Sequence, residues 1–310
     1  MGLGTAIQSI SMRLRGLNCR LISQEEYARQ YQLNGGSFIL HPEVLDFLHQ
    51  SHGVRAEYRG YFKDGRCIGA IATWGTFIAG ERYALRAHKI SDRIDFGCPV
   101  LYLPIASTRR CWVLFRARFL LNLQSSQIGG AFFPASKTMS ILKSIPDDLL
   151  SGKKEFKMKE RKFNDRGGEA RDIGQLSVDD VVTVYTDLFR QRWGRKPHAV
   201  GSLKETLAAL HKFLFGKVLM INDKPIAIQI NYRADTAPLI CIDYINGGVD
   251  KSAHALSPGS LLSYINGKVA CEEARARGRQ LVYSYGKSDM DYKDQWCNRV
   301  GRGFSGFWLP

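Results

Sequence analysis

Apolar and polar positions alternate in two separate stretches of the chain, and a short polar turn interrupts each stretch. The first stretch is 58–74, with Asp64-Gly65 as its turn, and the second is 216–232, with Asn222-Asp223 as its turn. A period of two around a two-residue turn of this composition is typical of a β-hairpin. The pattern therefore predicts one hairpin in each half of the chain.

The two predicted hairpins align with each other. Ile68 matches Ile226 at an offset of 226 − 68 = 158 residues. A constant offset between similar segments is what a tandem duplication leaves in a sequence. We predict two α/β domains, over residues 1–145 and 146–310, which agrees with a length of 310 residues.

A helical period follows in the second half. Ser177 and Asp180 form a capping-box pattern, in which side chains satisfy free backbone N–H groups at a helix start. The predicted helix ends near Arg192-Trp193-Gly194. Its apolar face consists of Val178, Val181, Val182, Tyr185, Leu188 and Phe189. A second helix and three strands are predicted over 203–215, 217–221, 226–232 and 239–245.

The next segment has the pattern of a crossover between parallel strands. Ser257 suits the N-cap of a helix and Pro258 its first position, and the helix extends to about Arg277 before a strand over 280–286. The first turn of such a helix offers N–H groups and a positive dipole end to a phosphate, and Gly259 and Ser260 allow close approach. A plain helix cap is the alternative.

The stretch between the halves is rich in lysine and arginine. Residues 146–173 predict a basic helix that ends at Gly167-Gly168 and leaves room for a strand after it. This helix is either a solvated connector or the wall of an anion-binding cleft.

The net charge of +15 favours contact with polyanions such as nucleic acid, anionic lipid head groups or a phosphorylated cofactor, or it marks a basic surface without a specific partner. The most apolar stretch, 111–123, contains Arg116 and Arg118 and is too short for a membrane span. Residues 7–20 fit a short basic amphipathic helix, which predicts weak attachment to an anionic leaflet or an ordinary surface helix.

Metal chemistry and several enzyme classes lack support. The seven cysteines include no Cys-x-x-Cys pair, and His49 and His52 have no nearby carboxylate or cysteine pattern, so we expect no metal site. Ser-His-Asp, P-loop and Gly-x-Gly-x-x-Gly motifs are also absent, which leaves hydrolases, kinases and dehydrogenases unsupported.

The residues SPGSLL at 257–262, the run YSYGKSDMDYKDQW at 283–296 and the helix at 177–197 resemble FemAB-like and related GNAT-type acyltransferases. With the stretch GGSFILHPEVLDFLH at 35–49, the whole chain resembles the macrophage-inducible (Mig) proteins. The resemblance implies an α/β (α+β) fold of tandem GNAT-like domains, with mixed twisted sheets flanked by helices and a degenerate first domain. It also implies resistance to cationic antimicrobial peptides, at the cytoplasmic face of the bacterial inner membrane.

The resemblance also implies a set of site residues. Ser257, Pro258, Gly259 and Ser260 would hold the phosphate end of an acyl donor, and Gly286 would line the cleft with Trp296 packed beneath it. Tyr292 and Lys293 would be catalytic residues of the cleft, and Arg192, Trp193 and Tyr285 would bind the substrate. The Arg/Gln-x-x-Gly-x-Gly/Ala loop of coenzyme-A-using GNAT enzymes is absent. This absence counts against an acetyl-CoA donor. The resemblance implies acyl-CoA or aminoacyl-tRNA as the donor, and aminoacyl-tRNA suits the positive charge.

Acyl transfer to an amine needs a proton acceptor. Asp243, within an apolar strand, is the first candidate, although its carboxylate is expected rather to pair with a nearby arginine; His198, His254 and Asp289 rank lower. The predicted acceptor is a cationic peptide or an envelope component. The alternatives are a binding protein of the same fold without chemistry, and a nucleic-acid-binding regulator supported by charge alone, with no specific DNA expected.

Overall fold

The computed structural model describes residues 18–143 and 154–306. Both halves contain the same run of a strand, two α-helices and a hairpin. In the first half these are β1 (Cys19–Leu21), α2 (Gln24–Asn34), α3 (Pro42–His52), β2 (Glu57–Lys63) and β3 (Arg66–Trp74). In the second half they are β10 (Gly168–Asp172), α7 (Val178–Trp193), α8 (Leu203–Leu210), β11 (Lys217–Ile221) and β12 (Lys224–Asp235).

Both predicted hairpins form, with the same kind of turn. Asp64 and Gly65 have φ angles of 50° and 74°, and Asn222 and Asp223 have φ angles of 49° and 61°. Two consecutive residues in the left-handed region define a type I′ turn, whose twist matches that of the flanking strands. Asn, Asp and Gly tolerate this region better than other residues, which is why the turns could be located from the sequence.

The hairpins also share a β-bulge. In the first, Tyr61 pairs with Gly69 and the register then skips Ile68. In the second, Leu219 pairs with Ala227 and the register skips Ile226. The skipped residues are the two isoleucines that align at an offset of 158. An irregularity repeated at the predicted offset strengthens the case for duplication, because a bulge is a conserved feature of a fold.

The rest of the chain completes two larger sheets. The first half continues through β4 (Phe77–Ile78), α4 (Arg82–Ala87), β5 (Cys111–Trp112), β6 (Ala117–Leu121), β7 (Ile128–Gly129), β8 (Ala131–Phe132) and β9 (Thr138–Leu142). The second half adds α6 (Lys154–Asn164), β13 (Leu239–Val249), α9 (Pro258–Ala276), β14 (Gln280–Lys287) and β15 (Cys297–Ser305). Strands β1 to β4 form one sheet, and the larger sheet has the order β10-β11-β12-β13-β14-β9-β15-β6 with β8 on β15.

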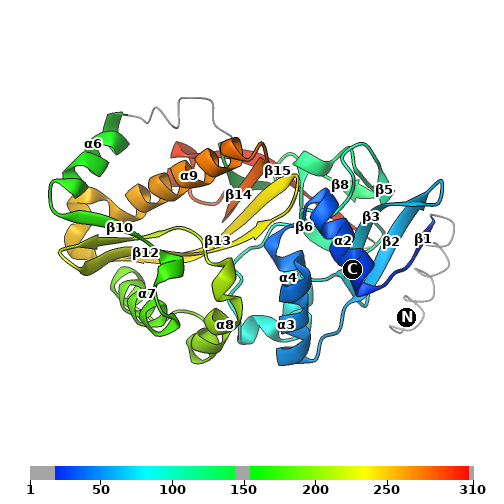
Figure 1. Cartoon of the computed structure of the whole chain (residues 1–310), viewed down its shortest axis with the longest axis horizontal. Coiled ribbons are helices and arrows are strands. Elements are labelled where there is room, and N and C mark those ends of the chain that lie inside the picture. The colour runs from blue at the N-terminus through cyan, green and yellow to red at the C-terminus, as the bar shows by residue number, and fades with distance from the viewer. Residues whose placement is uncertain (1–17, 144–153, 307–310) are drawn as a thin grey trace.

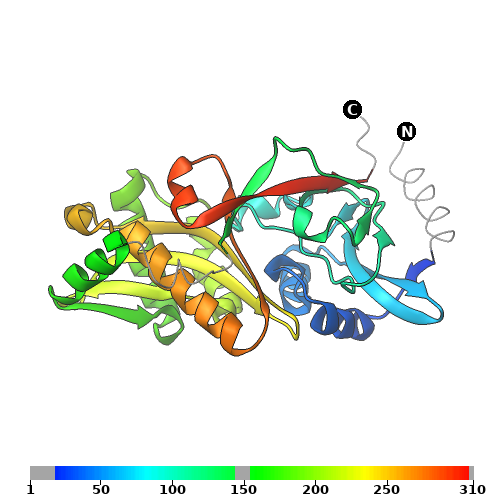
Figure 2. The same ribbon diagram turned by 90° about the horizontal axis from the view of Figure 1, so that it is seen from above.

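The two halves exchange strands. From the first half, β9 inserts between β14 and β15, and β15 runs on to pair with β6 and β8. Figure 2 shows β15, in red, crossing from one half of the molecule to the other. Strands thus cross the predicted boundary at 145/146 in both directions, and a division of the chain at that residue stays a prediction.

Helices cover both faces of the central strands. Figure 1 shows α9 on one side of β12 and β13 and α7 on the other. The α7 face buries Val181, Leu188 and Phe189 against Ile228 and Ile230. The α9 face buries residues that include Leu261, Leu262, Ala227, Ile242 and Tyr283. Strands β13 and β14, which flank α9 in the sequence, are parallel, so the predicted crossover is confirmed.

Several predicted elements have different limits. The predicted helix over 203–215 is wrong in its second part, because α8 ends at Leu210 and a 3₁₀ turn, His211–Phe213, follows. The ring of His211 lies 3.1 Å from the carbonyl of Leu176, which fixes this turn before β11. After β14 the chain forms a 3₁₀ turn, Asp291–Gln295. The predicted helix within 7–20 lies outside the described residues, apart from Asn18–Arg20.

The described part of the predicted connector forms α6 and β10. Phe156 of α6 stacks on Tyr264 of α9 with ring centroids 5.1 Å apart, and Glu160 pairs with Lys268 at 3.0 Å. The helix therefore packs along α9, and its apolar side is buried while Lys154 and Lys157 are exposed.

The contact between α7 and β13 depends on Gly248. A Cβ built on Gly248 would lie 2.4 Å from the backbone of Leu188 and Phe189, so no other residue fits without moving α7. We expect Gly248→Ala to lower the free energy of unfolding by about 3 kcal/mol, the upper range for overpacking. Urea unfolding measures this. Gly201→Ala, at a position where a Cβ would meet nothing within 4 Å, is the control and should stay within about 1 kcal/mol of the unmodified chain, the ordinary difference between Gly and Ala.

Candidate active site

Strands β13 and β14 separate at the centre of the second half. Their parallel pairing runs from Leu239–Gln280 to Asp243–Ser284 and stops there, although β13 continues to Val249 and β14 to Lys287. Ligands of open α/β sheets bind beyond the carboxyl ends of the strands. We call the region between Tyr244–Val249 and Tyr285–Lys287 the splay.

A segment of the first half covers one face of the splay. A Cβ built on Gly97 would lie 3.3 Å from Ile245 Cα, and one built on Gly286 would lie 3.7 Å from Cys98 Cβ. The backbone N–H of Val100 donates to Asp243 Oδ1 at 3.2 Å. Residues 97–100 therefore contact both diverging strands, and no pattern in the sequence indicated their role.

Aromatic rings fill the other face of the splay, which is the face that carries α9. Tyr244 and Tyr285 are stacked with centroids 5.4 Å apart, and Trp296 lies 6.0 Å from Tyr285. The Tyr285 hydroxyl donates to the carbonyl of Ser263 in α9 at 3.4 Å. The start of α9 and the segment 286–296 thus lie on the same side of the sheet, with packed aromatic side chains between them.

Asp243 lies at the root of the splay. Its side chain is 2% exposed, and Oδ2 has no hydrogen-bond partner. Burial raises the pKa of this carboxyl to about 7, and the N–H of Val100 opposes the rise. The expected pairing with an arginine is wrong, because no described arginine bonds to Asp243: the residue lies on the face that residues 97–100 seal with backbone.

The start of α9 differs from the predicted phosphate seat in detail. Ser257 is the N-cap, but it adopts left-handed angles (φ 48°, ψ 57°) and its hydroxyl makes no capping bond. The amides of Ser260 and Leu261 donate to the Ser257 carbonyl, and the amide of Ser257 donates to His254. Pro258 has no N–H, so among residues 257–261 the Gly259 amide is the one that does not donate to a backbone carbonyl. A left-handed, non-glycine residue is strained backbone of the kind found at functional sites.

Lys293 is held by its own segment. It is 8% exposed, and its ammonium donates to the Lys287 carbonyl at 2.8 Å and to Asp289 Oδ1 at 3.3 Å. Tyr292 beside it is 45% exposed and lies 5.9 Å from the ring of Trp296. Lys293 therefore fastens the turn 288–295 to the end of β14, and Tyr292 forms its accessible side.

Arg192 reaches the splay from α7. Its guanidinium donates to the Gly247 carbonyl at 3.2 Å and stacks on Trp193 at 4.6 Å. Burial raises the pKa of Tyr244, and the positive charge of Arg192 opposes that rise. Tyr244 was missed in the sequence analysis, although its place after Asp243 in a strand puts it on the opposite face.

The lower-ranked candidates lie away from the splay or at the surface. His198 bonds to the Ser91 carbonyl at 2.7 Å, and His254 is exposed before α9. His52 lies 2.8 Å from the hydroxyl of Ser51. No cluster of three or more potential metal ligands occurs within 18–143 and 154–306.

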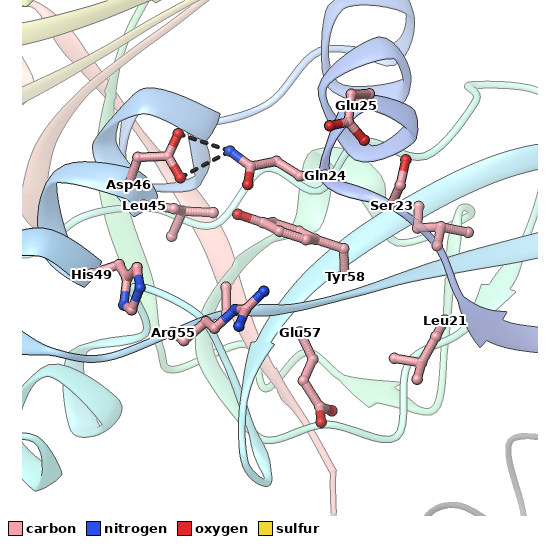
Figure 3. Close-up of a pocket in the computed structure, with 12 residues that line it drawn as sticks. Leu21, Ser23, Gln24, Glu25, Leu45, Asp46, His49, Arg55, Glu57 and Tyr58 are labelled. Carbon is pink, nitrogen blue, oxygen red and sulfur yellow. Dashed lines mark hydrogen bonds between the residues drawn. The ribbon is translucent and has the colours of Figure 1, made fainter.

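A pocket of about 1030 Å³ lies far from these residues, between α2, α3 and β2 (Figure 3). Its wall contains Asp46, whose two carboxylate oxygens accept from the Gln24 amide at 2.8 Å, beside His49, Arg55 and Tyr58. Its size does not make it the active site, since it shares no residue with the splay and its acidic and basic groups are mixed.

None of the helices in the described part of the chain combines the length and apolarity needed to cross a bilayer.

Sequence comparison places the chain in a family. The family model described as Mig-14 matches residues 41–303. The chain belongs to the Mig-14 family. This family match spans both halves and every element of the splay. No curated protein sequence matches the chain significantly.

The solved structure of FemX shares the fold of this Mig-14 protein, and two others are similar at lower scores. FemX superposes with a TM-score of 0.53 at 10% identity, covering 93% of this chain and 97% of FemX. L-PGS from Bacillus licheniformis gives 0.46 at 11% identity, covering 93% and 92% of the two chains. A tandem GNAT protein from the clavulanic acid biosynthesis pathway gives 0.42 at 9% identity, covering 94% and 99%. At these identities the similarity concerns the fold alone, and FemX confirms the predicted FemAB-like, mixed α/β architecture.

Proposed function

We propose that this Mig-14 protein transfers an acyl or aminoacyl group from an anionic donor to an amine, and that the reaction takes place at the splay. The observation that carries the proposal is Asp243, a buried carboxyl with a pKa of about 7 where two parallel strands separate. A group with a pKa near neutrality can accept and release a proton at physiological pH.

The reaction forms an amide bond and breaks the ester or thioester bond of the donor. The amine nitrogen attacks the donor carbonyl, loses a proton, and expels a hydroxyl or thiol that takes up a proton. We assign the proton-accepting role to Asp243, and because Asp243 is buried on the face opposite Tyr285, the proton reaches it through water between the separating strands. Tyr292 and Lys293, with Tyr285, form the wall at which the reacting groups meet, and Arg192 and Trp193 border the acceptor side.

The donor is acyl-CoA or aminoacyl-tRNA, and its phosphate end lies at the start of α9. The Gly259 amide and the hydroxyls of Ser257 and Ser260 are the groups available there, next to Pro258. A single unbonded amide is a weak anion-binding site, so additional cations must contribute to binding of the donor. Gly286, with a φ of 78°, allows β14 to turn away from β13 beyond the splay.

The biological role that we assign to this reaction is resistance to cationic antimicrobial peptides at the cytoplasmic face of the bacterial inner membrane. The acceptor is a cationic peptide or an envelope component. The net charge of +15 supports peripheral attachment to anionic lipid.

A transfer assay tests the proposal. The purified chain is incubated with a cationic peptide and either acetyl-CoA or a mixture of aminoacyl-tRNAs, and mass spectrometry detects the acceptor. We expect a mass increase equal to one acyl or aminoacyl group with one of the two donors. Binding of a donor without any mass increase would instead support a non-catalytic protein that binds partners at the membrane.

A further inference from the structure

Four basic side chains from four elements gather on the seam between the two halves. They are Arg82 of α4, Arg118 of β6, Lys287 of β14 and Arg302 of β15, and we call them the seam cluster. All four are half-buried, as is Cys98 at their centre. None of them is among the site residues predicted from the sequence, although Lys287 ends the β14 edge of the splay.

Contacts with Cys98 and with each other define the cluster. Arg82 Nη1 lies 3.6 Å from Cys98 Sγ. Arg302 Nη1 donates to the Arg118 carbonyl at 3.0 Å, and Arg118 Nη1 donates to the Tyr83 hydroxyl at 2.7 Å. Burial raises the pKa of the Cys98 thiol, while the charges of Arg82, Lys287 and Arg302 oppose the rise. All three cations therefore lie close enough to Cys98 to act on its thiol.

Little negative charge offsets the cluster. Among the described residues, no carboxylate forms an ion pair with Arg82, Lys287 or Arg302, and the ammonium of Lys287 makes no hydrogen bond. Glu81 interacts with Arg118 and accepts hydrogen bonds from the amides of Tyr83 and Ala84, which caps α4. Burying like charges together is unfavourable unless an anion joins them.

We infer that the seam cluster binds a phosphate group of a ligand. Guanidinium groups match the geometry of phosphate oxygens, and a multiply charged phosphate balances several cations better than a single carboxylate does. The cluster lies beside the splay, since Cys98 contacts Gly286 and Lys287 follows it in β14. The ligand therefore extends from the seam toward the splay. The binding does not require that transfer occurs, so it can be tested independently of the proposed reaction.

The reactivity of the Cys98 thiol shows whether a ligand occupies the seam cluster. Cys67 is the other half-buried cysteine among the described residues, so a Cys67→Ser background leaves Cys98 as the accessible thiol. Its rate of alkylation by N-ethylmaleimide, a neutral reagent, is measured with inorganic pyrophosphate and, separately, with vesicles of phosphatidylglycerol or phosphatidylcholine. We expect pyrophosphate or phosphatidylglycerol to slow alkylation. Protection by phosphatidylglycerol alone would show that the ligand is a lipid phosphate. Protection by pyrophosphate would show that it is a soluble phosphate.

Substitutions distinguish binding at the seam cluster from a general effect of positive charge. Lys287→Ala and Arg82→Ala should each raise the ligand concentration needed to protect Cys98 about tenfold. This is the effect expected when one hydrogen bond to a charged group is lost. Arg110→Ala, which removes an exposed arginine of the first half, should leave protection unchanged. Thermal unfolding verifies that each variant is folded. The inference is overturned by equal alkylation rates with and without both phosphates, or by equal effects of all three substitutions.

Discussion

A Lys293→Met chain is expected to lose group transfer by about a hundredfold in kcat, the loss typical of displacing groups that border the reacting atoms by about 1 Å. The methionine keeps most of the apolar stem but removes the ammonium that holds the Lys287 carbonyl at 2.8 Å. The turn 288–295, with Tyr292 on its accessible side, then loses its attachment to β14. Steady-state kinetics with the donor identified by mass spectrometry, and bacterial survival with cationic peptides, measure the effect.

Two further variants show what the ammonium does. Asp289→Ala removes an exposed partner at 3.3 Å and leaves the bond to Lys287, so activity should remain close to that of the unmodified chain. Tyr292→Phe removes only a hydroxyl and should abolish peptide resistance without changing the unfolding temperature. Full protection by both Lys293→Met and Tyr292→Phe would remove these residues from the catalytic assignment.

Asp243 is expected to make a contribution to the stability of the chain that falls as pH rises toward neutrality. Its pKa rises from 3.8 in the unfolded chain to about 7 in the folded chain, so the folded state binds the extra proton between these values. The carboxyl therefore contributes nothing unfavourable below pH 3.8, and its destabilising effect grows up to pH 7. The full effect is about 4 kcal/mol, and about 2 kcal/mol of it appears between roughly pH 5.5 and 8.5.

Asp243→Asn should remove this pH dependence while its amide oxygen still accepts the Val100 N–H. Urea unfolding at both pH values gives the free energies, and the variant should show about 2 kcal/mol less loss on going to the higher pH. Asp250→Asn is the control: Lys224 holds the pKa of Asp250 to about 2, so its titration falls below this range. The same loss of stability in Asp243→Asn and in the unmodified chain would show that Asp243 does not titrate near neutrality.

Local chemistry explains the successful predictions. The N-cap of α7 was predictable because the Ser177 hydroxyl accepts the Asp180 amide only three residues away. Gly194, predicted to end this helix, adopts the left-handed conformation that glycine favours (φ 70°). The crossover through α9 was predictable for the same reason, since its start and its return strand follow directly in the sequence.

Long-range packing explains the failures. The partner of Asp243 is Val100, 143 residues away, and no local pattern distinguishes a carboxylate held by that amide from one paired to an arginine. Tyr244 and residues 97–100 were missed for the same reason. The alternation of β13 does place Asp243 and Tyr244 on opposite faces, but it does not indicate what covers either face.

The amino-acid sequence by itself determined the type I′ turns, the repeated halves and the start of α9, because turns and caps form between residues a few positions apart. The tertiary structure alone decided that β13 and β14 separate beyond Asp243, and that Arg82, Lys287 and Arg302 meet around Cys98. These features arise when strands exchanged between the halves bring distant residues together, and the resulting burial sets the pKa of Asp243 and concentrates the positive charge.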